Sequence, residues 1–187
     1  KNPGLLQLGG RRQKVTVLFA DIKNFTAMSE KMEPERVVEV LNDYFTEMVD
    51  LVFAHQGTLD KFVGDALMAV FGVPVEIPQA ASQAVACAQA MHRRLGEMQI
   101  QGRTPIQGMR IGINTGEAIV GNIGSHKRMD FTVIGDAVNV AARLQELAKE
   151  LEADTLVSEA TCREVDGQFH FSPAPPQVLR GRRESTA

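Results

Sequence analysis

The chain has 187 residues, 44% of them hydrophobic, which is enough for one domain with a substantial core. Its net charge of -3 gives no electrostatic basis for binding nucleic acid, and aromatic residues at 5%, with no Trp, give no platform for stacking bases. No apolar run approaches the roughly 18 residues that span a bilayer. Cys87 and Cys162 lie far apart without metal-ligand spacing, as is usual in a reducing compartment. We therefore expect a cytoplasmic domain that binds no nucleic acid.

Apolar patterns taken in chain order predict an α/β sandwich. Residues 1–14 are expected to be a linker or entry segment and residues 15–187 one folded domain. The apolar run at 15–20 is typical of a buried strand, and helical spacing of apolar residues predicts helices over 35–56 and 80–98. The other expected elements are a hairpin of strands 58–62 and 66–71, strands 109–116, 117–123, 131–134 and 155–157, a helix over 136–150, a protruding arm at 121–129 and a C-terminal hairpin within 168–179. The β-α-β-β-α-β order indicates a ferredoxin-like α+β sandwich with a C-terminal extension.

Two acidic turns stand at the ends of predicted strands. Asp21 follows the first buried strand, and Asp65 follows Gly64 at the tip of the hairpin, with Lys61 on the incoming strand. Each Asp alone is best explained as a turn residue that binds its own backbone. In a ferredoxin-like sheet, however, the first strand lies beside this hairpin, so the two carboxylates can converge. With the backbone carbonyl of Ile22 they form a hard-oxygen site suited to Mg²⁺ or Mn²⁺.

Other polar groups could bind the phosphate and sugar parts of a ligand. The amides of Asn24, Phe25 and Thr26 open a helix, where backbone N–H groups can hold phosphate oxygens. Asn139 and Arg143 are four residues apart on one predicted helix and project from the same face. An amide beside a guanidinium can hold a sugar oxygen and stabilise a phosphate in its transition state. Alone, this pair is better explained as an exposed polar pair on a surface helix.

Three motifs occur in order along the chain: Phe-Ala-Asp-Ile-Lys-Asn-Phe-Thr at 19–26, Asp-Lys-Phe-Val-Gly-Asp at 60–65 and Thr-Val-Ile-Gly-Asp-Ala-Val-Asn-Val-Ala-Ala-Arg at 132–143. Together they resemble the class III nucleotidyl cyclase catalytic domain, over about residues 15–181. Three correctly spaced motifs are far more specific than any one of them. The resemblance implies the cyclase homology fold and cyclisation of a nucleoside triphosphate.

The resemblance also implies roles for single residues. Asp21 and Asp65 match the aspartates that bind two Mg²⁺ or Mn²⁺ ions, with the Ile22 carbonyl as a further ligand. The residues that match substrate-binding and catalytic positions are Lys61 and Thr132 for the purine, Asn139 for the ribose, Arg143 for the transition state and Arg180 for the terminal phosphates. In the family the metal site of one subunit faces the substrate groups of another. Because this chain has both sets, the resemblance implies a symmetric homodimer, with the arm at 121–129 as a candidate interface element.

The purine-binding residues favour ATP. The Lys61 ammonium can donate to adenine N1, and the Thr132 hydroxyl can accept from the exocyclic amine. Guanine presents the opposite pattern, which guanylyl members of the family usually meet with Glu and Cys. Many adenylyl members have Asp where this chain has Thr132, and the Thr variant resembles a bacterial subgroup that includes bicarbonate-responsive enzymes. Asn24, where a Gly is frequent, tolerates the same left-handed backbone and is expected to be neutral.

We therefore expect an adenylyl cyclase domain that converts ATP to cyclic AMP and pyrophosphate, with regulatory domains elsewhere in a longer parent chain and bicarbonate as a candidate effector. A guanylyl cyclase is the nearest alternative. A catalytically silent nucleotide-binding module would be favoured by loss of a site residue, and none is lost. A diguanylate cyclase is disfavoured because its Gly-Gly-Asp/Glu-Glu-Phe signature is absent from the sequence.

Overall fold

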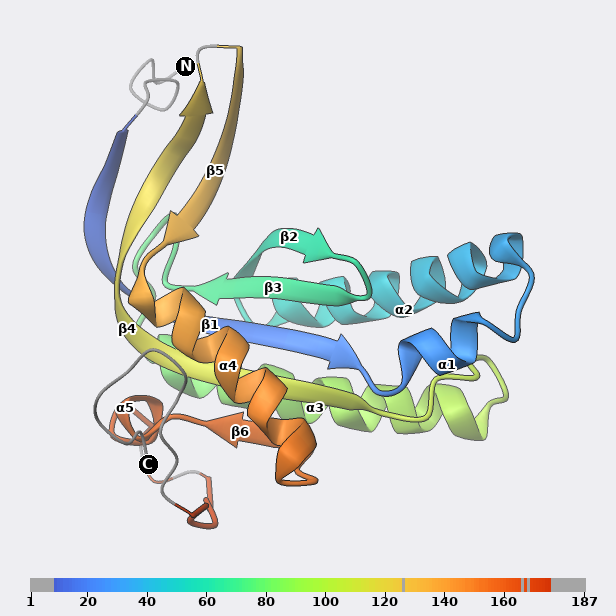
Figure 1. Ribbon diagram of the computed structural model, residues 1–187. Helices are drawn as coiled ribbons and strands as arrows, with labels where there is room; N and C mark the ends of the chain where they lie inside the picture. Colours follow the sequence, from blue (N-terminus) through green and yellow to red (C-terminus); the bar gives the residue numbers. More distant parts are fainter. Residues whose placement is uncertain (1–8, 126, 166, 168, 176–187) are drawn as a thin grey trace.

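The computed structural model describes residues 9–175 apart from 126, 166 and 168. A six-stranded sheet forms its centre, in the order β2-β3-β1-β4-β5, with β6 pairing on β4 (Figure 1). The strands are β1 (Gly9–Ile22), β2 (Gly57–Val63), β3 (Ala66–Phe71), β4 (Met109–Ser125), β5 (Arg128–Ile134) and β6 (Thr155–Val157). The helices are α1 (Phe25–Ser29), α2 (Pro34–Ala54), α3 (Ala80–Ile100), α4 (Asp136–Glu150) and α5 (Glu159–Cys162).

The predicted ferredoxin-like arrangement is confirmed. Strand β1 lies between β3 and β4 and is antiparallel to both. Strands β2 and β3 form the predicted hairpin, which turns at Gly64 with a φ of 63°. Because successive side chains of a strand point to opposite faces, Leu18 and Ala20 of β1 pack in the core under α2 and α3, whereas Val15 and Val17 pack toward α4. Burial on both faces explains the continuous apolar run in this strand.

Strand β1 begins at Gly9, so the last six residues of the expected linker or entry segment, 9–14, belong to a strand. These residues pair with the segment of β4 that ends at Asn122. Most of them are exposed, so they lack the apolar pattern by which a buried strand is recognised. The division of 109–123 into two strands is wrong, because Gly116 pairs with Val15 and does not take a positive φ, so β4 continues through it.

The predicted arm is the β4–β5 hairpin, which projects from the body of the molecule together with the first half of β1 (Figure 1). The expected C-terminal hairpin is not seen where the chain is described, since residues 169–175 form no strand; three prolines at 173, 175 and 176 interrupt this segment. Residue 168 and residues 176–187 lie outside the described part. Among the described helices, none is long and apolar enough to cross a membrane.

Candidate active site

Asp21 and Asp65 come together as predicted. Asp21 is the penultimate residue of β1, and Asp65 lies in the turn between β2 and β3, the strand next to β1. The two side chains lie close enough for a hydrogen bond in which a protonated Asp21 donates to Asp65. Burial, followed by the negative charge of Asp65 and this hydrogen bond, raises the pKa of Asp21 to about 6. The site therefore holds more negative charge than it can stabilise by itself.

Two residues that the sequence motifs did not indicate stabilise the charged form of Asp21. Arg110 lies opposite Asp21 in the β1–β4 ladder, and Gln145 of α4 donates from Nε2 to the Asp21 Oδ2 at 3.2 Å. Both lower the pKa of Asp21 and so oppose the effect of burial. The Nε of Arg110 is buried and has no hydrogen-bond partner among the described residues. A charged residue facing an Asp across a ladder could have been found only once the register of the strands was known.

Tyr44 of α2 closes the site from the core side. The side chain is fully buried, and its hydroxyl donates weakly to the sulfur of Met109 at 3.9 Å. Burial and the charges of Asp21 and Asp65 raise the pKa of the phenol well above its usual range. The Tyr44 phenol therefore stays protonated beside the carboxylates and does not act as a base.

The residues of the site fit a divalent cation of the Mg²⁺ type. Two adjacent carboxylates and the carbonyl of Ile22 are hard oxygen donors, and a cation would offset the burial and the repulsion from Asp65 that raise the pKa of Asp21. In the part of the chain that is described, no cluster of three or more His, Cys, Asp or Glu side chains could hold a metal. A Mg²⁺ ion commonly uses one or two carboxylates and takes its other ligands from water and substrate phosphates. The donor set is therefore suited to ions that bind together with a phosphate-bearing substrate.

Lys61 and Thr132 meet at Asp60, a residue that the sequence reasoning did not single out. The Thr132 hydroxyl donates to Asp60 Oδ2 at 2.9 Å, and the Lys61 ammonium lies 3.3 Å from the same oxygen. The Asp60 side chain is only 4% exposed, whereas that of Lys61 is 48% exposed. The buried carboxylate thus joins β2 to β5. The signal in the sequence was an Asp inside a strand, where this residue type is rare.

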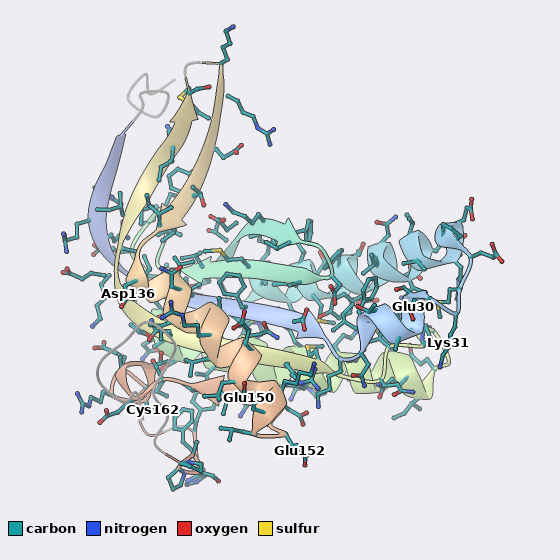
Figure 2. The ribbon with its side chains drawn as sticks, in the orientation of Figure 1. Glu30, Lys31, Asp136, Glu150, Glu152 and Cys162 are labelled. Atoms are coloured by element: carbon teal, nitrogen blue, oxygen red, sulfur yellow. The ribbon has the colours of Figure 1, made fainter. Side chains whose placement is uncertain are left out.

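Asn139 and Arg143 lie on α4, which begins at Asp136 and ends at Glu150 (Figure 2). Asn139 is exposed and Arg143 is partly exposed, on a helix whose buried positions face the sheet. Neither side chain has a hydrogen bond or ion pair with another described residue. Both side chains are therefore available to a ligand or to a second subunit.

The remaining predicted positions lie at the start of α1 or beyond the described chain. Asn24 precedes α1 with φ 56° and ψ 31°, the left-handed conformation expected for it. Phe25 and Thr26 are the first residues of that helix, and their binding of phosphate stays a prediction. Arg180 lies outside the described residues.

Comparison with known proteins identifies the family. Residues 9–187 match the family described as Adenylate and Guanylate cyclase catalytic domain. Adenylate cyclase 1 of Rhizobium meliloti is 38% identical over 180 residues, which cover 93% of this chain and 27% of that protein. The chain belongs to the adenylate and guanylate cyclase catalytic domain family, which confirms the class III cyclase resemblance. It spans only about a quarter of the length of this relative.

Solved structures of the family have the same fold. The adenylyl cyclase CyaB from P. aeruginosa superposes with a TM-score of 0.88 at 35% identity, covering 96% of this chain and 93% of that one. The guanylyl cyclase Cya2 superposes with a TM-score of 0.87 at 36% identity, covering 96% and 91%. Overall similarity to an adenylyl and to a guanylyl cyclase is thus nearly equal, so the choice of nucleotide must be argued from single side chains.

Proposed function

We propose that this chain is the catalytic domain of an adenylyl cyclase, which converts ATP to 3′,5′-cyclic AMP and pyrophosphate. The proposal of ATP as the substrate rests on one observation, that Lys61 and Thr132 both contact the carboxylate of Asp60 and so lie side by side. A Lys ammonium is a donor only, and a Thr hydroxyl can accept. This pair fits the N1 acceptor and the exocyclic amine of adenine.

In the proposed reaction the ribose 3′ oxygen forms a bond to the α-phosphorus while the bond from that phosphorus to the β-bridging oxygen breaks. Pyrophosphate leaves, and the 3′ proton passes to solvent or to a substrate oxygen. Arg143 would stabilise the negative charge that develops on the phosphate, and Asn139 would hold the ribose in line. Arg180 and the amides of 24–26 are proposed to bind phosphate oxygens.

The two Mg²⁺ or Mn²⁺ ions that Asp21, Asp65 and the Ile22 carbonyl would hold supply, when bound, positive charge that lowers the pKa of the 3′ hydroxyl and anchors the triphosphate. Gln145 and Arg110 keep the Asp21 carboxylate in place toward this position. Asp65, in its hairpin turn, completes the pair of carboxylates.

We propose further that the active unit is a symmetric homodimer with two shared sites. In one chain, contacts join Asp21, Asp65 and Gln145 in one cluster and Lys61, Asp60 and Thr132 in another. Among the described residues, no hydrogen bond or ion pair connects the two clusters. The side chains of Asn139 and Arg143 have no such contact with either cluster. A second copy, related by a twofold axis, would bring the complementary groups together.

The test is a product assay on the purified chain, supplied with equal ATP and GTP and with Mg²⁺ or Mn²⁺, at several protein concentrations. Cyclic AMP, with specific activity rising as the protein is concentrated, is the expected result. Cyclic GMP as the main product would favour the guanylyl alternative, for which the similarity to Cya2 is the specific observation. A folded dimer that forms neither product would instead be a silent nucleotide-binding module.

A bicarbonate response remains a prediction that follows from Thr132 alone. A bicarbonate titration at fixed pH that left the rate of cyclisation unchanged would remove it.

A further inference from the structure

Asp60 occupies an irregular position in strand β2. The pairing with β3 shifts register between Leu59 and Lys61, so that Asp60 is the extra residue of a β-bulge. A bulge turns a side chain away from the direction that regular alternation would give it. Here the carboxylate of Asp60 is buried, at 4% exposure, although the neighbouring Lys61 is half exposed. Burying a carboxylate is costly unless it is paired, so its partners define its use.

The partner that matters is the hydroxyl of Thr132. A Thr hydroxyl has one proton and two lone pairs, and a free one can rotate to donate or to accept. A carboxylate only accepts, so the contact of 2.9 Å between Thr132 Oγ1 and Asp60 Oδ2 uses the single Thr132 proton. The remaining lone pairs of this oxygen can only accept. The Lys61 ammonium, 3.3 Å from the same carboxylate oxygen, keeps other protons for a ligand.

We infer that Asp60 is a specificity-determining positioning residue, which makes Thr132 an obligatory acceptor beside the donor Lys61. This inference rests on the proposed function, in which these two side chains face the purine. Adenine offers an amine donor and an N1 acceptor and is complementary to this pair. Guanine offers O6 as an acceptor and N1–H as a donor, so both of its groups would meet like groups. A site that is built to hydrogen-bond one partner discriminates strongly against another that leaves its buried groups unpaired.

Two substitutions separate the hydrogen-bond acceptor of Asp60 from its negative charge. In Asp60→Ala the acceptor is lost, the Thr132 hydroxyl can rotate, and it can donate to guanine O6. In Asp60→Asn the charge is lost, but an amide oxygen can still accept from Thr132. We expect the ratio of kcat/KM for ATP to that for GTP to fall at least about tenfold in Asp60→Ala, the effect of one lost discriminating hydrogen bond. Asp60→Asn is expected to keep the ratio within about threefold of the wild-type value.

The experiment measures both ratios, together with dissociation constants of ATP and GTP by calorimetry and thermal unfolding of each variant. Asp50→Ala, on the exposed side of α2, is the matched control for loss of an acidic residue. Asp60→Ala is also made in a Thr132→Val background, which has no hydroxyl at position 132. If Asp60 acts through that hydroxyl, its loss should not change the ATP-to-GTP ratio any further in this background. A tenfold fall that disappears in this background supports the inference.

Three results would overturn the inference. The first is an ATP-to-GTP ratio of kcat/KM that is unchanged in folded Asp60→Ala, and the second is a fall in this ratio that is equally large when Asp60→Ala is made in the Thr132→Val background. The third is a ratio that is unchanged in Thr132→Val alone. The last applies even if Asp60→Ala fails to fold. A wild-type chain that prefers GTP contradicts the proposed function instead. If the wild type is catalytically silent, the same comparison is made on the dissociation constants of ATP and GTP. Failure of the inference about Asp60 can therefore be told apart from failure of the proposed function.

Discussion

Gly112 of β4 and Gln145 of α4 lie in direct backbone contact. A Cβ atom at Gly112 would lie 2.3 Å from the backbone nitrogen of Gln145 and 2.3 Å from the carbonyl oxygen of Ala141. Only a residue without a side chain lets α4 approach the sheet this closely. The approach brings the Gln145 side chain within hydrogen-bond distance of Asp21 on the neighbouring strand. A glycine on one strand therefore sets the environment of a carboxylate on another.

Gly112→Ala is expected to destabilise the fold, because the atoms that the new methyl group meets belong to the backbone and cannot rotate away. Overpacking of this kind costs about 1–3 kcal/mol, which for a chain of this size lowers Tm by about 2–4 °C per kcal/mol. Gly96→Ala is the matched control, since Gly96 lies inside α3 with nothing within 4 Å of an added Cβ. There the helix propensity of Ala should raise Tm slightly. Equal changes in the two variants would contradict the close packing of α4.

Gln145→Leu is expected to weaken the binding of Mn²⁺ by roughly three- to tenfold, because Asp21 loses the amide that holds its Oδ2. Titration of free Mn²⁺ by electron paramagnetic resonance measures this without any turnover. Gln89→Leu, on the exposed side of α3, is the control. Unchanged Mn²⁺ affinity in Gln145→Leu would show that the contact does not position the carboxylate.

The contribution of Asp21 to the stability of the metal-free protein should fall as pH rises from about 4 to about 7. The pKa of Asp21 is about 6 in the folded chain against an ordinary value of 3.8, so within this interval Asp21 binds more protons in the folded state than in the unfolded one. Raising the pH then favours unfolding, until Asp21 is ionised in both states. Thermal unfolding from pH 4 to 8, compared with Asp21→Asn, measures the difference. A variant curve parallel to that of the wild type would refute the assignment of this titration to Asp21.

Stabilisation by Mn²⁺ should have the opposite dependence on pH. A cation competes with the proton on Asp21, whose pKa is about 6, so it should raise Tm little at pH 5 and more at pH 7.5. The comparison uses a fixed Mn²⁺ concentration, with Asp65→Asn as the variant that removes half of the site. An increase in Tm that is the same at both pH values would mean that Mn²⁺ binds elsewhere.

Asp21→Asn and Arg143→Ala are each expected to abolish most cyclase activity, and mixing the two chains should restore part of it. If subunits assort at random, half of the dimers are mixed, and each has one intact site, giving about a quarter of the wild-type rate. Asp21→Asn mixed with Asp65→Asn, both in the same half-site, is the control that should recover nothing. No recovery in the first mixture, with exchange of subunits confirmed, would contradict the shared site.

Much of the fold was predictable because its signals are local. Helical spacing located α2 and α3, and Gly64 between two apolar runs located the hairpin that presents Asp65. The first half of β1 was missed because exposed strand residues carry no apolar alternation, and their pairing with β4 is long-range information. The unexpected continuation of β4 through Gly116 has the same origin.

The positions of site residues that belong to a sequence motif could be predicted. Contacts that depend on the register between strands could not. Asp21 and Asp65 could be paired from the topology of a ferredoxin-like sheet alone. Asp60 depends on a bulge that shifts the β2–β3 register, and Arg110 depends on which residue of β4 faces Asp21. No sequence pattern reports either register, so these contacts required the structure.

The pairing of β1 has a consequence for how the chain folds as it is synthesised. Among the described strands, the half of β1 that begins at Gly9 pairs with β4 alone, and its partner residue Asn122 is made more than 100 residues after Gly9. At ribosomal rates of about 5–20 residues per second, this half of the strand stays without its partner for on the order of ten seconds. During that interval it is an open strand edge, which other chains can pair with. The polar and basic residues of this segment, among them Arg11 and Arg12, are the kind that discourage such pairing.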